Sequence, residues 1–149
     1  MSKPQSPSLT IKRRFKAPAE KVFAAWTRPE ALKAWFRPND AHTVLVAETD
    51  VRVGGRYRLV AKDATEEHRV GGVYKEIVAN RRLVFTWAWK QEDGSRGHET
   101  EVTITFEPVG KHTKLTLVQT LFAEEVHRDN HSKGWESSFN SLEKYLASA

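Results

Sequence analysis

The sequence contains no cysteine, which excludes disulfide bonds, thiolate metal ligands and cysteine nucleophiles together. It also has no apolar run near the ~20 residues that a membrane-spanning helix requires, so we expect no membrane insertion. The first eight residues include one lysine but no apolar segment behind it, and they do not fit a secretory signal. These absences suit a reducing compartment, and we expect a cytoplasmic protein whose residues 1–8 form a disordered tail.

The common catalytic and metal-binding motifs are missing too. There is no Gly-x-Ser-x-Gly, no glycine-rich phosphate loop and no His-Glu-x-x-His. His127 and His131 are four residues apart, which suits a divalent metal on one helical face, but no third ligand accompanies them. We therefore predict no metal site, no cofactor and no catalytic residue. The alternative is an enzyme in which His98 or Tyr57 acts as an acid–base group in an apolar cavity.

The positive charge does not indicate nucleic-acid binding, although the formal net charge is +5. The basic residues are scattered among 19 acidic ones, whereas nucleic-acid binding usually needs a basic stripe on one face. With 39% apolar and 29% charged residues in a chain of 149, the composition is typical of one folded domain. We expect that domain to span 9–149 and to be a monomer or a weak homodimer.

What the sequence does contain is a series of alternating patterns that are typical of half-buried strands. The first pattern puts four residues on one face: Leu9, Ile11, Arg13 and Phe15. Between 42 and 121, turn residues separate about six further strands, as in an antiparallel meander. Three of these strands have shared faces made of Leu83, Phe85, Trp87 and Trp89; of His98, Thr100, Val102, Ile104 and Phe106; and of Leu115, Leu117, Gln119 and Leu121. Gly71 and Gly72 suit the bulges that curve a sheet.

Helical patterns complete the fold prediction. Short apolar stripes follow Pro18 and Pro29, and proline suits the first turn of a helix. From about Ala123 the period is that of a long helix, whose single apolar stripe is Trp135, Phe139, Leu142 and Leu146. That stripe must pack on the inner faces of the strands. The sequence thus predicts an α+β fold in which a curved antiparallel sheet of about six to seven strands wraps around a C-terminal helix, with two short helices between the first two strands.

A sheet bent around one helix leaves space where the strand ends spread apart. Large, rigid aromatic side chains hold the walls of such a space open, and a few polar groups can orient a ligand. We predict a ligand site for an apolar or aromatic small molecule, formed by Trp35, Tyr57, Trp87, Trp89, His98, Thr100, Gln119 and Trp135. Taken singly, Trp35 and Trp135 are better explained as core residues, so the prediction depends on the set.

Two residues depart from the patterns around them. Arg13 lies on an inward strand face, and we expect it to form a buried ion pair with an acidic residue that the sequence does not identify. Gly134 lies inside the last helix, where glycine costs about 1 kcal/mol relative to alanine. It indicates either close packing on a strand or room for a ligand beside Trp135.

Several short motifs are spread over most of the chain. They are IKRRF at 11–15, VFAAW at 22–26, PEAL at 29–32, WF at 35–36, DVRVGG at 50–55, GVYKEI at 72–77 and HSKGW at 131–135. Together they resemble bacterial proteins homologous to the C-terminal domain of the activator of heat-shock protein 90 ATPase. Those proteins belong to the START-like, or birch-pollen-allergen-like, superfamily, which has the helix-grip fold.

The resemblance implies that a hydrophobic small molecule binds between the sheet and the long helix, and we expect it to bind without catalysis. It leaves two alternatives, a chaperone cofactor that stimulates a heat-shock protein 90 type ATPase and a small polyketide cyclase or hydrolase. The chaperone alternative is weakened because the chain resembles only the C-terminal half of the eukaryotic activator. Members of the family commonly have histidine where this chain has Gln119.

Overall fold

The computed structural model describes residues 7–37, 42–90 and 93–148. Their elements, in chain order, are β1 (Leu9–Phe15), α1 (Ala19–Thr27), α2 (Pro29–Trp35), β2 (Thr43–Thr49), β3 (Arg56–Lys62), β4 (Glu67–Val78), β5 (Arg82–Trp89), β6 (Thr100–Val109), β7 (His112–Thr120) and α3 (Glu125–Ser148). The predicted fold class is confirmed, with two short helices between the first two strands and a long helix at the C-terminal end.

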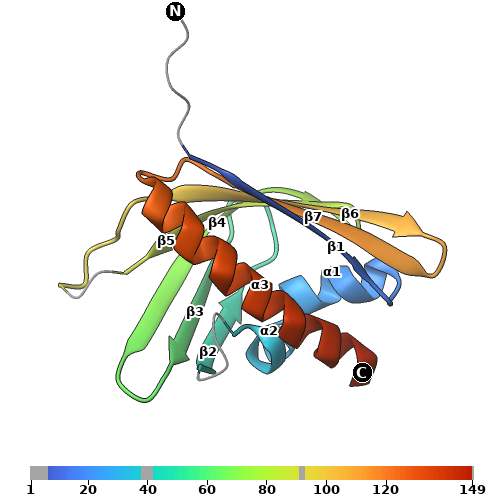
Figure 1. Ribbon diagram of the computed structural model, residues 1–149, viewed down its shortest axis with the longest axis horizontal. Coiled ribbons are helices and arrows are strands. Elements are labelled where there is room, and N and C mark those ends of the chain that lie inside the picture. Colours follow the sequence, from blue (N-terminus) through green and yellow to red (C-terminus); the bar gives the residue numbers. More distant parts are fainter. Residues whose placement is uncertain (1–6, 38–41, 91–92, 149) are drawn as a thin grey trace, which may run out of the picture.

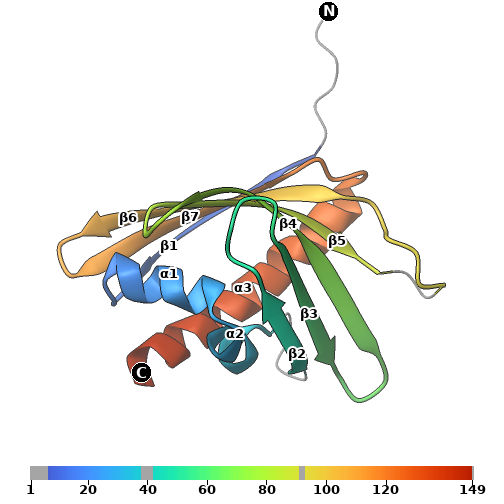
Figure 2. The ribbon, with the colours of Figure 1, turned by 180° about the vertical axis from the view of Figure 1, so that it is seen from behind.

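All the strands belong to one antiparallel sheet, in the order β1-β7-β6-β5-β4-β3-β2. In Figure 1, α3 runs diagonally across the concave side of this sheet, and α1 and α2 lie on the same side. From behind, β2, β3 and the first part of β4 descend steeply from the arch formed by the rest of the sheet (Figure 2). The sheet therefore grips α3, as the two hydrophobic periodicities predict.

The strand pairing is irregular at two places, and irregularities of this kind favour bending of a sheet. The pairing register shifts within β2 and again within β4. Gly72 lies where β4 closely approaches β5, and a Cβ atom there would collide with the carbonyl oxygen of Thr86. The Thr86 hydroxyl also accepts a hydrogen bond from the backbone N–H of Val73 at 2.9 Å. Glycine is therefore required at position 72 by a close strand contact.

The core fills the space between the concave face and the helices. The predicted stripe of α3 is buried throughout: Trp135, Phe139, Leu142 and Leu146. Its rings pack against strand residues, with ring centroids 4.9 Å apart between Trp135 and Trp87 and 5.8 Å apart between Phe139 and Phe15. These contacts hold α3 against both β5 and β1.

Arg13 connects β1 to α3, and its acidic partner is Glu136. It donates hydrogen bonds at 2.8 Å to Glu136 Oε2 and to Asn140 Oδ1, and its guanidinium lies 5.6 Å from the centre of the Phe139 ring. The expectation of a buried ion pair is wrong, however, because the side chains of Arg13 and Glu136 are 21% and 51% exposed. The pair lies at the rim of the helix–sheet interface, where water solvates both charges.

Two residues at strand ends depart from the predicted faces. β6 begins only at Thr100, so His98 lies before it, exposed to solvent, with its Nε2 against the carbonyl oxygen of Leu121. β7 ends at Thr120, and Leu121 adopts a left-handed backbone conformation with 51% exposure. Phe122 is buried in place of Leu121. Of the predicted N-terminal tail, residues 1–6 lie outside the described residues.

Candidate ligand site

An apolar pocket of about 400 Å³ lies between the end of β5 and the first half of α3. Its lining residues are Phe36, His68, Trp87, Trp89, Asn130, His131, Gly134, Trp135 and Ser138. The volume is within the range of about 300–1,000 Å³ that is usual for small-molecule sites. No lysine, arginine or carboxylate lines the pocket among the described residues. The pocket therefore suits a small, uncharged and mostly apolar ligand.

Three tryptophans and one phenylalanine form the aromatic wall. Trp87 and Trp89 are two residues apart on β5, so their side chains lie on the same face of the strand. Their rings meet edge to face with centroids 5.6 Å apart. The Trp87 ring also contacts Trp135 of α3, with centroids 4.9 Å apart, and Phe36, with centroids 6.0 Å apart. Rings that support one another in this way leave little freedom for the wall to collapse.

Trp89 and His131 connect β5 to α3 across the pocket. Trp89 Nε1 donates a hydrogen bond to His131 Nε2 at 2.9 Å. Since that nitrogen accepts, the ring proton of neutral His131 is on Nδ1, which lies 2.7 Å from the carbonyl oxygen of His127. Burial lowers the pKa of His131, and the nearby His127 lowers it further, against the opposing effect of the His127 carbonyl. His131 is therefore held neutral, as its hydrogen bond from Trp89 requires.

A chain of buried hydrogen bonds lies behind the wall and fixes the orientation of Trp135. Trp135 Nε1 donates to Gln119 Oε1 at 2.8 Å, and Gln119 Nε2 donates to Thr100 Oγ1 at 2.8 Å. Thr100 Oγ1 in turn donates to the carbonyl oxygen of Trp87 at 3.0 Å. Gln119 and Thr100 are thus engaged in positioning two wall residues, Trp135 and Trp87.

Two of the pocket residues carry a buried polar atom. Trp87 Nε1 and Ser138 Oγ are buried and have no hydrogen-bond partner among the described residues. A buried polar group without a partner is costly and rare in folded proteins. Both residues line the pocket, so a small movement of either side chain would let its polar group donate a hydrogen bond to a ligand with an oxygen acceptor.

The structure does not bring all the predicted site residues together. Trp87, Trp89 and Trp135 line the pocket, whereas Thr100 and Gln119 form the buried chain behind it. Trp35 does not line this pocket: it is fully buried and donates from Nε1 to the carbonyl oxygen of Ala25 at 2.7 Å. The remaining two, Tyr57 and His98, also lie outside its lining.

Tyr57 lies beside the apolar pocket without lining it, and the centroids of its ring and the Trp87 ring are 6.3 Å apart. Its hydroxyl donates to the carbonyl oxygen of Thr86, and burial raises its pKa well above the usual value. It borders a wider hollow of about 680 Å³ formed mainly by charged side chains and the backbone of β3 and β4. Two of the arginines there form close ion pairs, Arg58 with Glu48 at 2.8 Å and Arg96 with Glu99 at 3.0 Å. The wider hollow is therefore less suited to an apolar ligand.

Several pocket residues were not predicted from the sequence as ligand-binding residues. His131 was considered only as a metal ligand with His127, but both its ring nitrogens are engaged in other contacts. Ser138 could have been found, because it lies three positions after Trp135 and therefore near the same helical face. His68 and Phe36 carry no such signal, since only the folded chain brings them beside Trp87 and Trp89.

In the described part of the chain, no helix combines the length and the apolar character needed to cross a membrane.

Solved structures with this architecture come from several bacteria. The AHSA1 protein from Silicibacter pomeroyi has a TM-score of 0.85 at 26% identity, covering 95% of this chain and 98% of that chain. A protein from Chromobacterium violaceum has a TM-score of 0.83 at 27% identity, covering 94% and 97%. A protein from Rhizobium leguminosarum has a TM-score of 0.82 at 28% identity, covering 97% of each chain.

A curated relative is an uncharacterized protein from Schizosaccharomyces pombe, 27% identical over 119 residues. The match takes in 78% of this chain and 31% of the relative, so the chain spans about a third of the length of the curated relative it matches. The family model described as "Activator of Hsp90 ATPase homolog 1-like protein" matches residues 16–147. The match confirms the resemblance indicated by the sequence motifs and extends over nearly the whole chain: this protein belongs to the Activator of Hsp90 ATPase homolog 1-like (AHSA1) family.

Proposed function

We propose that this protein binds an uncharged, apolar or aromatic small molecule in the pocket between β5 and α3, without catalysing a reaction on it. The observation that carries the proposal is the combination of an aromatic wall, an adequate volume and two buried polar atoms without described partners, Trp87 Nε1 and Ser138 Oγ. The START-like fold often holds hydrophobic ligands, which supports the same conclusion.

The chemistry of the wall narrows the class of ligand. Because an indole N–H can only donate, Trp87 favours a ligand that carries an acceptor such as a carbonyl or ether oxygen. His131 is held neutral and accepts from Trp89, so it offers no charge to an ionic ligand. An aromatic ketone or a similar flat molecule with one oxygen fits these features.

The alternative of a cyclase or hydrolase has less support. Its two candidate acid–base groups, Tyr57 and His98, do not line the apolar pocket. Burial raises the pKa of Tyr57 and so disfavours the phenolate that a base would need. His98 is exposed and contacts the carbonyl oxygen of Leu121. Neither residue is therefore positioned to act on a molecule held between β5 and α3.

The test compares two probes of nearly the same shape, 2-acetylnaphthalene, which has a carbonyl acceptor, and 2-ethylnaphthalene, which has none. Binding is followed by calorimetry and by the N–H signals of the five indole rings in NMR spectra of the ¹⁵N-labelled protein. We expect both probes to bind, the ketone more tightly, and the Trp87 signal to shift most with the ketone.

The matched variants are Gly134→Leu and Gly134→Ala, because Gly134 lines the pocket. The leucine side chain should fill the pocket and abolish binding, whereas the single methyl group of alanine should weaken it only slightly. The proposal fails if neither probe binds and the protein, purified without detergent, carries no small molecule in native mass spectrometry. It also fails if Gly134→Leu binds as well as the natural sequence.

A second candidate function, stimulation of a heat-shock protein 90 type ATPase, is favoured by membership of the AHSA1 family. It does not require the pocket, so Gly134→Leu should leave it intact. The measurement is the ATPase rate of the chaperone with and without equimolar protein. An unchanged rate, together with no complex in a pull-down, would remove this candidate.

A further inference from the structure

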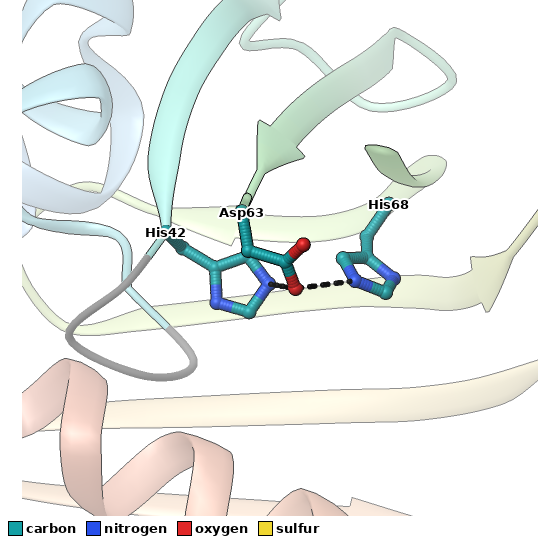
Figure 3. A group of neighbouring side chains, drawn as sticks. All are labelled: His42, Asp63 and His68. Carbon is teal, nitrogen blue, oxygen red and sulfur yellow. Dashed lines mark ion pairs between the residues drawn. The ribbon is translucent and has the colours of Figure 1, made fainter. Parts of the chain in front are cut away.

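Three potential metal ligands meet at one end of the sheet, at the turn between β3 and β4. Asp63 begins this turn, His68 lies in β4, and His42 immediately precedes β2. The strand register brings them together, since Thr43 pairs with Lys62 and Ala61 pairs with His68. Figure 3 shows one carboxylate oxygen of Asp63 between the two imidazole rings, each of which turns a nitrogen toward it.

The nitrogen and oxygen atoms of this cluster are close enough together to bind one metal ion. Asp63 Oδ2 lies 3.8 Å from His42 Nε2 and 3.5 Å from His68 Nε2. The three ligand atoms all lie within 4.8 Å of one another. Both N–O separations are too long for hydrogen bonds. They are slightly longer than the ~3.3 Å between neighbouring ligands in a tetrahedral zinc site, so small side-chain rotations would complete the geometry.

The carboxylate of Asp63 is oriented for this role. Its Oδ1 accepts hydrogen bonds from the backbone N–H groups of Thr65 and Glu66, both at 2.8 Å, and from the Thr65 hydroxyl at 3.0 Å. These bonds hold the pKa of Asp63 well below its usual range, so the carboxylate is charged at neutral pH. With Oδ1 committed to the turn, Oδ2 is the oxygen directed at the two histidines.

The two imidazoles are held by their surroundings. The His42 side chain is only 6% exposed, and its ring packs edge to face against His68 with centroids 5.0 Å apart. His68 also contacts the Trp89 ring, at 6.3 Å, and lines the apolar pocket. Ligands held in this way lose little freedom when an ion binds.

We propose that His42 Nε2, Asp63 Oδ2 and His68 Nε2 bind a divalent transition metal ion of the zinc class. Two imidazoles and one carboxylate suit zinc, cobalt or nickel, whereas magnesium and calcium prefer oxygen ligands alone. Three protein ligands leave one position of a tetrahedral site for water or another small ligand. No short motif in the sequence indicates this site. Metal binding does not require the proposed binding of an apolar molecule, although His68 also lines that pocket.

The test uses the tag-free protein after treatment with a chelator. Cobalt(II) is added first, because its visible absorption reports tetrahedral coordination, and zinc is then measured by competition with a chromophoric chelator. We expect one equivalent to bind and to raise the melting temperature. His68→Ala should weaken zinc binding by about ten-fold or more, because it removes one of three ligands.

Asp63→Asn is the second variant. Its amide oxygen can still accept the hydrogen bonds of the turn that Oδ1 accepts, whereas its NH₂ group cannot bind a metal ion. This variant should also lose the visible absorption of bound cobalt, and circular dichroism should show that its metal-free fold is unchanged. The matched control is His127→Ala, an exposed histidine of α3 that should bind zinc like the natural sequence. The proposal is overturned if the natural protein binds no cobalt or zinc, or if binding survives His68→Ala. It is equally overturned if His127→Ala, and not His68→Ala, removes the site.

Discussion

Trp89 and His131 are joined by a hydrogen bond of 2.9 Å in which the indole nitrogen donates and the imidazole Nε2 accepts. The bond exists only while His131 is neutral, because a protonated imidazole would direct a second N–H at the indole. It links the end of β5 to the first half of α3, and both residues line the apolar pocket. The protonation state of one histidine is therefore coupled to the wall of the candidate ligand site.

The first prediction concerns the dependence of stability on pH. Burial, with a contribution from His127, lowers the pKa of His131 from its ordinary value of 6.5. Below that value the unfolded chain binds a proton that the folded chain does not, so stability is lost as the pH falls from above 6.5 toward the lowered pKa. The melting temperature, measured between about pH 8 and pH 5, should fall on acidification.

The matched variant for this prediction is His131→Gln, whose amide oxygen can accept from Trp89 but does not titrate. It should show a smaller fall in melting temperature over the same range. An equal fall in both proteins would mean that other groups cause the acid sensitivity.

The second prediction concerns Gln119, which accepts a hydrogen bond from Trp135 and donates one to Thr100. Gln119→Leu leaves the buried indole N–H without a partner, so it should lower the free energy of unfolding by about 1–3 kcal/mol in urea denaturation. Gln119→His should cost less, because an imidazole can still accept from Trp135. If leucine is tolerated as well as histidine, the buried hydrogen bonds do not stabilise the fold.

The third prediction concerns Ser138, whose buried hydroxyl has no hydrogen-bond partner among the described residues. Ser138→Ala should raise the free energy of unfolding of the ligand-free protein by about 1 kcal/mol, because it removes an unsatisfied polar group. The same change should reduce the preference for 2-acetylnaphthalene over 2-ethylnaphthalene in calorimetry. Lower stability in the variant would show that the hydroxyl is already satisfied in solution.

The fourth prediction compares the same substitution at two glycines. Gly72→Ala should destabilise the protein by about 2 kcal/mol or more, because the new methyl group collides with the carbonyl oxygen of Thr86. Gly134→Ala should instead stabilise it by up to about 1 kcal/mol, since Gly134 lies inside α3 beside the open pocket. Chemical denaturation of both variants checks the two signs, and a loss at Gly134 would mean that this position is closely packed.

The sequence determined the fold through patterns that depend on local chemistry. The stripe of Trp135, Phe139, Leu142 and Leu146 has a helical period, and the alternation of Phe85, Trp87 and Trp89 has a strand period. Each pattern identifies the face that must be buried, so the helix and the sheet could be paired before any contact was known. The family motifs led to the same architecture.

The tertiary structure alone decided which residues share a site. The alternating pattern from His98 to Phe106 predicts an inward-facing His98, but β6 begins only at Thr100. An alternating pattern does not show at which residue the pairing of strands begins. Thr100 and Gln119 face inward as predicted, but they are hydrogen-bonded to each other and do not line the aromatic pocket.

The cluster of His42, Asp63 and His68 depends entirely on the register of three strands. Register is fixed by pairing between distant segments, and no short motif in the sequence records it. Periodicity thus predicted the sheet, the helix and much of the aromatic wall, whereas the polar contacts that give the pocket and the metal cluster their chemistry required the folded chain.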